Sequence, residues 1–322
     1  MIVYNFIYFY FIIILFFIYF ESTDILKSSY FVSNKANNIL INKIIGKVHN
    51  IIVLIHRTFK ISPIYMVDSK DHVKKIIYTF WTGTNPMTAN RKEGIKIMKE
   101  KTGVEICVIT IDNLNNFILK DNPLHPSYKY LSRVHKADYL RCYFMHHYGG
   151  GYADIKRQTD SWEKYFNIIN DNPNIWKIGL GGFNPSSNAF GIAYPEEYNS
   201  IQRKKLQNYH SKMVGVGFMI CRPRTPYTTE WYNLLHQRLD NYSTELKKHP
   251  AVFSREAFDR EPSKYWGDEK DPELKKLPCP TKKTKYPISW NRILGQIVYP
   301  LQVKYINHIK QGLPMPDWDN YE

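Results

Sequence analysis

The sequence predicts an α/β domain, because strand-like and helix-like stretches alternate along it. Residues 75–83 alternate in character, are rich in β-branched side chains and end on a glycine, as a strand does. The basic amphipathic stretch 89–101 indicates a helix, and the apolar run 104–110 is typical of a strand buried in a parallel sheet. Strand, helix and strand in this order form a βαβ unit.

Length and charge restrict the kind of protein and the kind of partner. The 322 residues suffice for one globular domain, which we expect at 71–312, followed by an acidic tail at 313–322. The net charge of +15 suits an anionic partner such as a nucleotide diphosphate, a phospholipid surface or an acidic glycan. The basic residues are scattered and carry no nucleic-acid-binding motif, so nucleic acid is not an expected partner. The four cysteines form no Cys-x-x-Cys pair, so a structural zinc site is not expected.

The first residues predict a membrane anchor. Residues 1–21 are almost wholly apolar, and a helix of about 20 such residues spans a bilayer. A cleaved signal peptide fits less well, because no basic residue precedes the segment and no small-residue cleavage site follows it. We therefore expect a transmembrane signal-anchor with the membrane as a partner, a single-pass type II localisation in the secretory pathway, and a basic stem at 22–70.

The central stretch predicts a ligand site. Residues 135–148 read as a helix that places Asp138 and Arg141 on one face, and Gly149–Gly151 then end it. A short strand follows and ends on Asp154, where open α/β sheets place their ligands. Glycine also lets a ligand approach the backbone closely, so the stretch suits diphosphate binding beside a nucleotide cleft. The alternative is an ordinary helix end beside a surface ion pair.

The same residues resemble a known family. The strings 131–141 and 149–154 resemble the sugar-binding region of DXD-containing glycosyltransferases. The capsular polysaccharide synthesis proteins are the most similar, the yeast-type initiating mannosyltransferases are more distant, and the resemblance runs from about Lys75 to Ile309. It implies a GT-A-like, Rossmann-like mixed sheet flanked by helices, a nucleotide-sugar donor and usually a divalent cation, Mn or Mg.

The resemblance also implies an activity and a set of site residues. The expected function is a hexosyltransferase that moves a hexose from a nucleotide sugar to a glycan or glycoprotein acceptor. Asp154 would be the catalytic residue and the metal ligand. The expected donor-binding residues are Asp138, Arg141, His135, Lys136, Gly150, Gly151, Lys156 and Trp81. The long charged stretch 254–287 is where acceptor contacts are expected, since connections of this length are often functional.

One position departs from the family's pattern. The second acid of the Asp-x-Asp pair is replaced by Lys156. Because Mg²⁺ and Mn²⁺ prefer oxygen ligands, a lysine cannot hold either. Three interpretations stay open: Asp154 holds a cation with help from the diphosphate and water, Lys156 neutralises a phosphate without a metal, or the site is inactive.

Two other classes of function compete with the transferase. The first is a catalytically inactive, membrane-tethered carbohydrate-binding or scaffolding protein, which would not hydrolyse a nucleotide sugar. The second is a membrane protein that binds nucleic acid or phosphoinositides through its charge, and its binding would fall steeply with salt.

Overall fold

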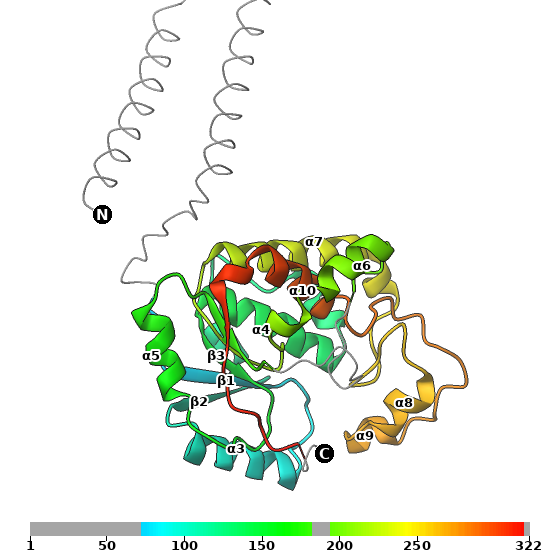
Figure 1. Ribbon diagram of the computed structural model, residues 1–322. Coiled ribbons are helices and arrows are strands. Elements are labelled where there is room, and N and C mark those ends of the chain that lie inside the picture. Colours follow the sequence, from blue (N-terminus) through cyan, green and yellow to red (C-terminus); the bar gives the residue numbers. More distant parts are fainter. Residues whose placement is uncertain (1–71, 182–193, 319–322) are drawn as a thin grey trace, which may run out of the picture. The chain divides into compact units, whose positions relative to one another are not determined.

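A six-stranded mixed sheet with helices on both faces lies at the centre of the structure (Figure 1). The structure is a computed structural model, and it describes residues 72–181 and 194–318. The strands, in the order β2-β1-β3-β5-β4-β6, are β1 (Ile76–Trp81), β2 (Glu105–Thr110), β3 (Gly150–Ala153), β4 (Lys177–Gly179), β5 (Phe218–Cys221) and β6 (Ile309–Gln311). The α-helices are α3 (Ala89–Lys101), α4 (Arg133–His147), α5 (Glu163–Asp171), α6 (Ser200–Gln207), α7 (Pro226–Lys248), α8 (Pro262–Gly267), α9 (Pro272–Lys275) and α10 (Gly295–Lys304).

The strand directions bring several loops to one end of the sheet. β1 is parallel to β2 and to β3, β5 is antiparallel to β3 and to β4, and β4 is parallel to β6. The carboxyl ends of all these strands except β5 therefore meet at one end, together with the amino end of β5. We call this the carboxyl end of the sheet, and it is where α/β sheets bind their ligands.

Alternation along the strands divides the core between the two faces of the sheet. Tyr78 and Phe80 of β1 contact Phe144 of α4, with ring centroids 4.9 and 5.2 Å apart, in a core that α7 and α10 complete. Ile77, between the two, joins the core on the opposite face, to which α3 and α5 contribute. Because side chains alternate between the two faces along a strand, Tyr152 of β3 lies on the face that α4 covers. Asp154, two residues later, is directed to that face as well.

The predicted α/β fold, a mixed sheet flanked by helices, is confirmed, with two differences in detail. The strand predicted at 104–110 forms as β2, but β2 is an edge strand with partly exposed side chains, because no strand among residues 72–181 and 194–318 pairs with its outer side. The stretch 175–183 of the sequence predicts a second sheet region. β4 instead joins the same sheet beside β5, and residues 182–183 lie outside the described part.

The expected type II membrane localisation is contradicted. Among residues 72–181 and 194–318, no helix combines the length and the apolar character that crossing a bilayer requires. The longest of the named α-helices, α7, has 23 residues but carries charged side chains along its length, among them Glu230, Arg238 and Lys247. The predicted anchor at 1–21 and the predicted stem at 22–70 lie outside the described residues.

Gly149 ends α4 and turns the chain into β3. Its φ of +65° lies in the left-handed region, and a Cβ there would stand 2.5 Å from Cδ of Pro223 and 3.0 Å from the Cys221 carbonyl oxygen. We expect Gly149→Ala to lower the free energy of unfolding by about 2 kcal/mol, since alanine resists this backbone conformation and the added methyl group has no room. Urea denaturation measures the change.

Gly267 offers the matched control. No heavy atom lies within 4 Å of the position that its Cβ would take, so Gly267→Ala should change stability by no more than about 0.5 kcal/mol. Equal effects of the two substitutions would contradict the role given to Gly149.

Candidate functional site

Asp154 lies at the carboxyl end of the sheet, directly after β3. Its backbone N–H donates to the carbonyl oxygen of Gly217, 2.9 Å away, at the amino end of β5. A Cβ on Gly217 would stand only 2.9 Å from Oδ2 of Asp154, so the carboxylate fits there because this residue has no side chain. The Asp154 side chain is 33% exposed, which leaves the carboxylate accessible to a ligand.

One guanidinium connects Asp154 to a second acid. The Tyr152 hydroxyl donates to Oδ1 of Asp154 at 2.6 Å, and Nη2 of Arg141 lies 3.4 Å from the same oxygen. Nη2 of Arg141 also donates to the Tyr152 hydroxyl at 2.9 Å and lies 3.5 Å from Oδ1 of Asp138. We call Asp138, Arg141, Tyr152 and Asp154 the Arg141 cluster. Only Asp154 in it is substantially exposed.

Burial sets the protonation of the Arg141 cluster. It raises the pKa of Asp138 to about 7, against the opposing effect of Arg141 and with a further rise from Asp154. Burial by itself lowers the pKa of Arg141, but Tyr152, Asp154 and Asp138 outweigh it and raise this pKa above its usual value. Burial also raises the pKa of Tyr152 well above its usual range. The guanidinium therefore stays charged and the phenol neutral, while Asp138 can gain or lose a proton near neutral pH.

The cluster unites three of the residues that the sequence proposed: Asp138, Arg141 and Asp154. It also contains Tyr152, which the sequence analysis missed although a spacing of two residues in a strand puts it on the same face as Asp154. Gly217 was missed in the same way. It belongs to a small-residue stretch for which a ligand and close packing are both possible explanations, and the structure favours close packing against Asp154.

His135 and Lys136 lie away from the cluster's exposed carboxylate. His135 is fully buried, and its ring nitrogens hydrogen-bond with the Tyr286 hydroxyl at 2.8 Å and the Trp290 carbonyl oxygen at 3.3 Å. Burial lowers the pKa of His135 to about 4, so the ring is neutral at pH 7. Nζ of Lys136 lies 5.9 Å from the centroid of the Tyr128 ring, and burial lowers its pKa. The roles of both residues in donor binding stay predictions.

The predicted glycines and tryptophan occupy different ends of the sheet. Gly150 and Gly151 begin β3, at the opposite end from Asp154, and Cβ atoms on them would stand 3.0 Å from the Ile76 carbonyl oxygen and 2.8 Å from the Ile77 side chain. The absence of a side chain therefore allows close packing between the strands at both positions. Trp81 ends β1 at the carboxyl end, where its indole N–H donates to the carbonyl oxygen of Asn85 at 2.8 Å.

Lys156 lies under the last described residues of the chain. Its Nζ is 3.5 Å from the centroid of the Trp318 ring and 5.7 Å from that of Phe218. Burial lowers the pKa of Lys156 to about 8, although the carboxylate of Asp154 acts in the opposite direction. The ammonium therefore remains mostly protonated at pH 7 and lies within the electrostatic influence of Asp154.

The donor set at Asp154 does not fit a divalent cation held by the protein. In the described ranges, no three His, Cys, Asp or Glu side chains are grouped so that they could hold a metal ion. Oδ1 of Asp154 already accepts from the Tyr152 hydroxyl and lies beside the Arg141 guanidinium, and the residue two positions after Asp154 is a lysine, Lys156. A cation at this point would meet one carboxylate and two fixed positive charges.

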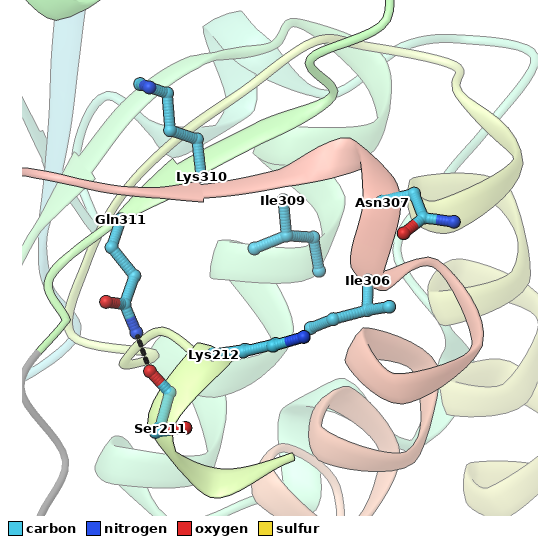
Figure 2. Close-up of a pocket in the computed structure, with 7 residues that line it drawn as sticks. All are labelled: Ser211, Lys212, Ile306, Asn307, Ile309, Lys310 and Gln311. Atoms are coloured by element: carbon cyan, nitrogen blue, oxygen red, sulfur yellow. Dashed lines mark hydrogen bonds between the residues drawn. The ribbon is translucent and has the colours of Figure 1, made fainter.

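Asp154 lines neither of two cavities in the described part of the chain. The first, of about 460 Å³, lies beside β6, and Figure 2 shows Lys212 and Lys310 among its lining residues. Gln311 fixes one side of it by donating to the Ser211 carbonyl oxygen at 2.8 Å (Figure 2). The second, of about 430 Å³, lies in the segment between α7 and α10. The nucleotide cleft beside Asp154 stays a prediction.

Comparison with known proteins gives little further information. No protein-family model matches the chain, and no curated protein sequence does. One solved structure with detectable similarity is described as "PaToxG Glycosyltransferase". It is 14% identical, with a TM-score of 0.30, and the similar region covers 55% of this chain and 65% of that chain, less than two thirds of its length.

Proposed function

We propose that the chain is a GT-A-like glycosyltransferase that moves a hexose from a nucleotide-sugar donor to a glycan or glycoprotein acceptor. The observation that carries the proposal is the Arg141 cluster, in which an exposed carboxylate at the carboxyl end of the sheet is fixed by a buried guanidinium and a phenol. The resemblance of the strings 131–141 and 149–154 to the sugar-binding region of the DXD-containing enzymes supports it, because these strings contain the whole cluster.

The cluster supplies groups that orient a donor. Transfer breaks the bond between the anomeric carbon and the diphosphate oxygen, and donors stay aligned only if their hydroxyl groups are held. In the proposal, Asp154 accepts a hydrogen bond from a hydroxyl of the donor's sugar or ribose. Tyr152 and Arg141 hold this carboxylate in one orientation, and Asp138 balances the charge of Arg141 from the buried side.

The leaving diphosphate also needs a positive charge close to it. We propose that Lys156 supplies this charge and that no divalent cation is required, because Lys156 occupies the position of the second acid and the surrounding donor set does not suit a metal. In this role, the ammonium would exchange its contact with the Trp318 ring for one with a phosphate oxygen.

The test is a thermal-shift screen of the chain with UDP- and GDP-sugars, with Mn²⁺ or with EDTA. A donor at 100 times its dissociation constant should stabilise the folded state by about 2.7 kcal/mol, whether or not the cation is present. Asp154→Asn should reduce donor hydrolysis by about 100-fold or more. Asp112→Asn, an exposed acid in the loop after β2, is the matched control and should not change it.

Two results would count against the proposal. If no nucleotide sugar stabilises the chain, the transferase assignment is wrong. If a donor binds but is never hydrolysed, the rival carbohydrate-binding function is favoured, in line with the replacement of the second acid by Lys156. If a donor binds only when Mn²⁺ is present, the role given to Lys156 is wrong, but the transferase function stands.

A further inference from the structure

A cavity in the segment between α7 and α10 is lined by three cationic side chains. It is a hollow of about 430 Å³ that is open to solvent, and the cations are Arg255, Arg260 and Lys264. Trp290 also lines it, and we call this the Trp290 cavity. The residues come from stretches up to 36 positions apart, from 255 to 291, so the fold of the segment assembles the cavity.

The two arginines are held in place before any ligand binds. Their guanidinium carbons lie 4.6 Å (Arg260) and 5.4 Å (Arg255) from the centroid of the Trp290 ring. Nη2 of Arg260 lies 2.6 Å from Oδ2 of Asp268, and Nε of Arg255 lies 3.8 Å from the same oxygen. Nη1 of Arg260 also donates to the Arg255 carbonyl oxygen at 3.0 Å. Side chains fixed in this way lose little entropy when they bind a planar anion.

The acids near the cavity are engaged by other groups. Oδ1 of Asp259 accepts the Trp290 backbone N–H at 2.7 Å, and Glu261, which is 61% exposed, pairs with Lys283 at 3.3 Å. Asp268 is shared by both arginines. Among the lining residues, three cations face two acids, Asp259 and Glu261. Each of these acids already has a partner, a backbone N–H for Asp259 and Lys283 for Glu261.

The Trp290 cavity is connected to the helix that carries the Arg141 cluster. The Trp290 carbonyl oxygen hydrogen-bonds with His135 of α4 at 3.3 Å, and His135 precedes Asp138 by one helical turn. The ion pair between Arg133 and Asp271, 2.5 Å long, fastens the same segment to the start of α4. Neither Asp138, Arg141 nor Asp154 lines the cavity, so it is separate from the candidate donor residues.

We propose that the Trp290 cavity binds a carboxylate or phosphate group of the acceptor, so that the acceptor is an acidic glycan. The acceptor role rests on the proposed transferase function, whereas anion binding does not. Two preset guanidinium groups match the planar, bidentate geometry of a carboxylate or phosphate, and a neutral sugar offers them only uncharged, weaker hydrogen-bond acceptors. The exposed Lys264 on α8 adds a charge at the rim.

The experiment measures binding of three probes to the full chain by isothermal titration calorimetry at low salt: tetragalacturonate, galactotetraose as its neutral counterpart, and glucose 6-phosphate. We expect binding of tetragalacturonate or glucose 6-phosphate, and the comparison shows which anion is preferred. Arg255→Gln and Lys264→Ala should each weaken this binding about fivefold or more. The matched control Lys276→Ala, an exposed lysine after α9 outside the cavity, should leave it unchanged.

Three outcomes would overturn the proposal. The first is binding of galactotetraose as tight as that of the anionic probes, and the second is a loss of anion binding in Lys276→Ala as large as in the cavity variants. The third outcome is weaker nucleotide-sugar binding in Lys264→Ala, which would assign the cavity to the donor. Circular dichroism checks that the Arg255→Gln variant folds. If that variant does not fold, Lys264→Ala still tests the proposal, because Lys264 is exposed and its replacement should not disturb folding. Donor hydrolysis by the unsubstituted chain is measured in parallel. If hydrolysis is absent while the anion binds, the transferase function fails and anion binding stands.

Discussion

Replacement of Arg141 by methionine is expected to lower the free energy of unfolding at pH 7 by about 3–5 kcal/mol. The guanidinium is nearly fully buried and lies 3.5 Å from Asp138 and 3.4 Å from Asp154. Methionine fills a similar volume but leaves the buried Asp138 without a positive partner and the Tyr152 hydroxyl without a donor. Urea denaturation measures the loss, and donor binding should fall with it.

The loss should depend on pH because Asp138 can be protonated. Burial raises the pKa of Asp138 from 3.8 to about 7, so the folded state favours the protonated acid. The stability that this acid contributes is therefore fully present below pH 3.8 and is lost as the pH rises to about 7. Without Arg141, which lowers this pKa, Asp138 would hold its proton to higher pH. The cost of Arg141→Met should thus be smaller at pH 5 than at pH 8.

Two further variants control the experiment. Arg141→Met combined with Asp138→Asn should recover part of the loss, since it removes the uncompensated carboxylate as well. Arg203→Met, on the exposed surface of α6, should change stability by no more than about 0.5 kcal/mol. A loss at Arg141 below 1 kcal/mol that does not vary with pH would show that the guanidinium does not balance a buried charge.

Local patterns predicted those parts of the fold that depend on local interactions. The helix expected at 89–101 has these bounds as α3, where the Thr88 side chain accepts from the N–H of Arg91 as an N-cap. The stop at Gly149 followed from the left-handed backbone that only glycine adopts easily. Asp154 could likewise be placed at a strand end, because glycines and a short strand precede it in the sequence.

Contacts between distant residues could not be predicted in this way. His135 has the sequence position of a ligand-binding residue, but its hydrogen bonds go to Tyr286 and Trp290, some 150 residues later in the chain. The edge position of β2 depends on strand order, which periodicity does not encode. The contact between Lys156 and the Trp318 ring is a further case, because it joins residues far apart in the sequence.

Three histidines between α4 and α7 are expected to make the fold sensitive to acid. His146 and His147 of α4 have ring centroids 4.8 and 4.9 Å from that of Tyr232 of α7, and the His236 ring lies 4.1 Å from the same ring. Burial lowers the pKa of each of the three from 6.5 to about 4. For His146 and His147, the charge of Arg224 adds to this effect, and for His236 the nearby His125 lowers the pKa while Asp240 raises it.

The sign follows from the unfolded chain, whose histidines take up protons near pH 6.5. The stability that these three neutral rings contribute is fully present above about pH 6.5 and is lost as the pH falls towards 4. After allowance for partial exposure, each ring should lose about 1 kcal/mol between pH 7 and pH 5. A variant with His146→Phe, His147→Phe and His236→Gln should therefore show an acid-induced loss that is smaller by about 3 kcal/mol.

Between pH 7 and pH 5, Asp138 changes stability in the opposite direction to the three histidines. Variants that remove one of the two effects therefore test the assignment more sharply than the unsubstituted chain alone. As the pH falls from 7 to 5, the folded state gains from protonating the buried Asp138 while it loses from the three rings. Asp138→Asn removes only the gain, so its unfolding free energy should fall more steeply with acid than that of the unsubstituted chain. The triple histidine variant should be less steep, and His72→Gln, at an exposed histidine, should be parallel to the unsubstituted chain. Parallel curves for all four proteins would mean that neither the rings nor the acid are buried as described.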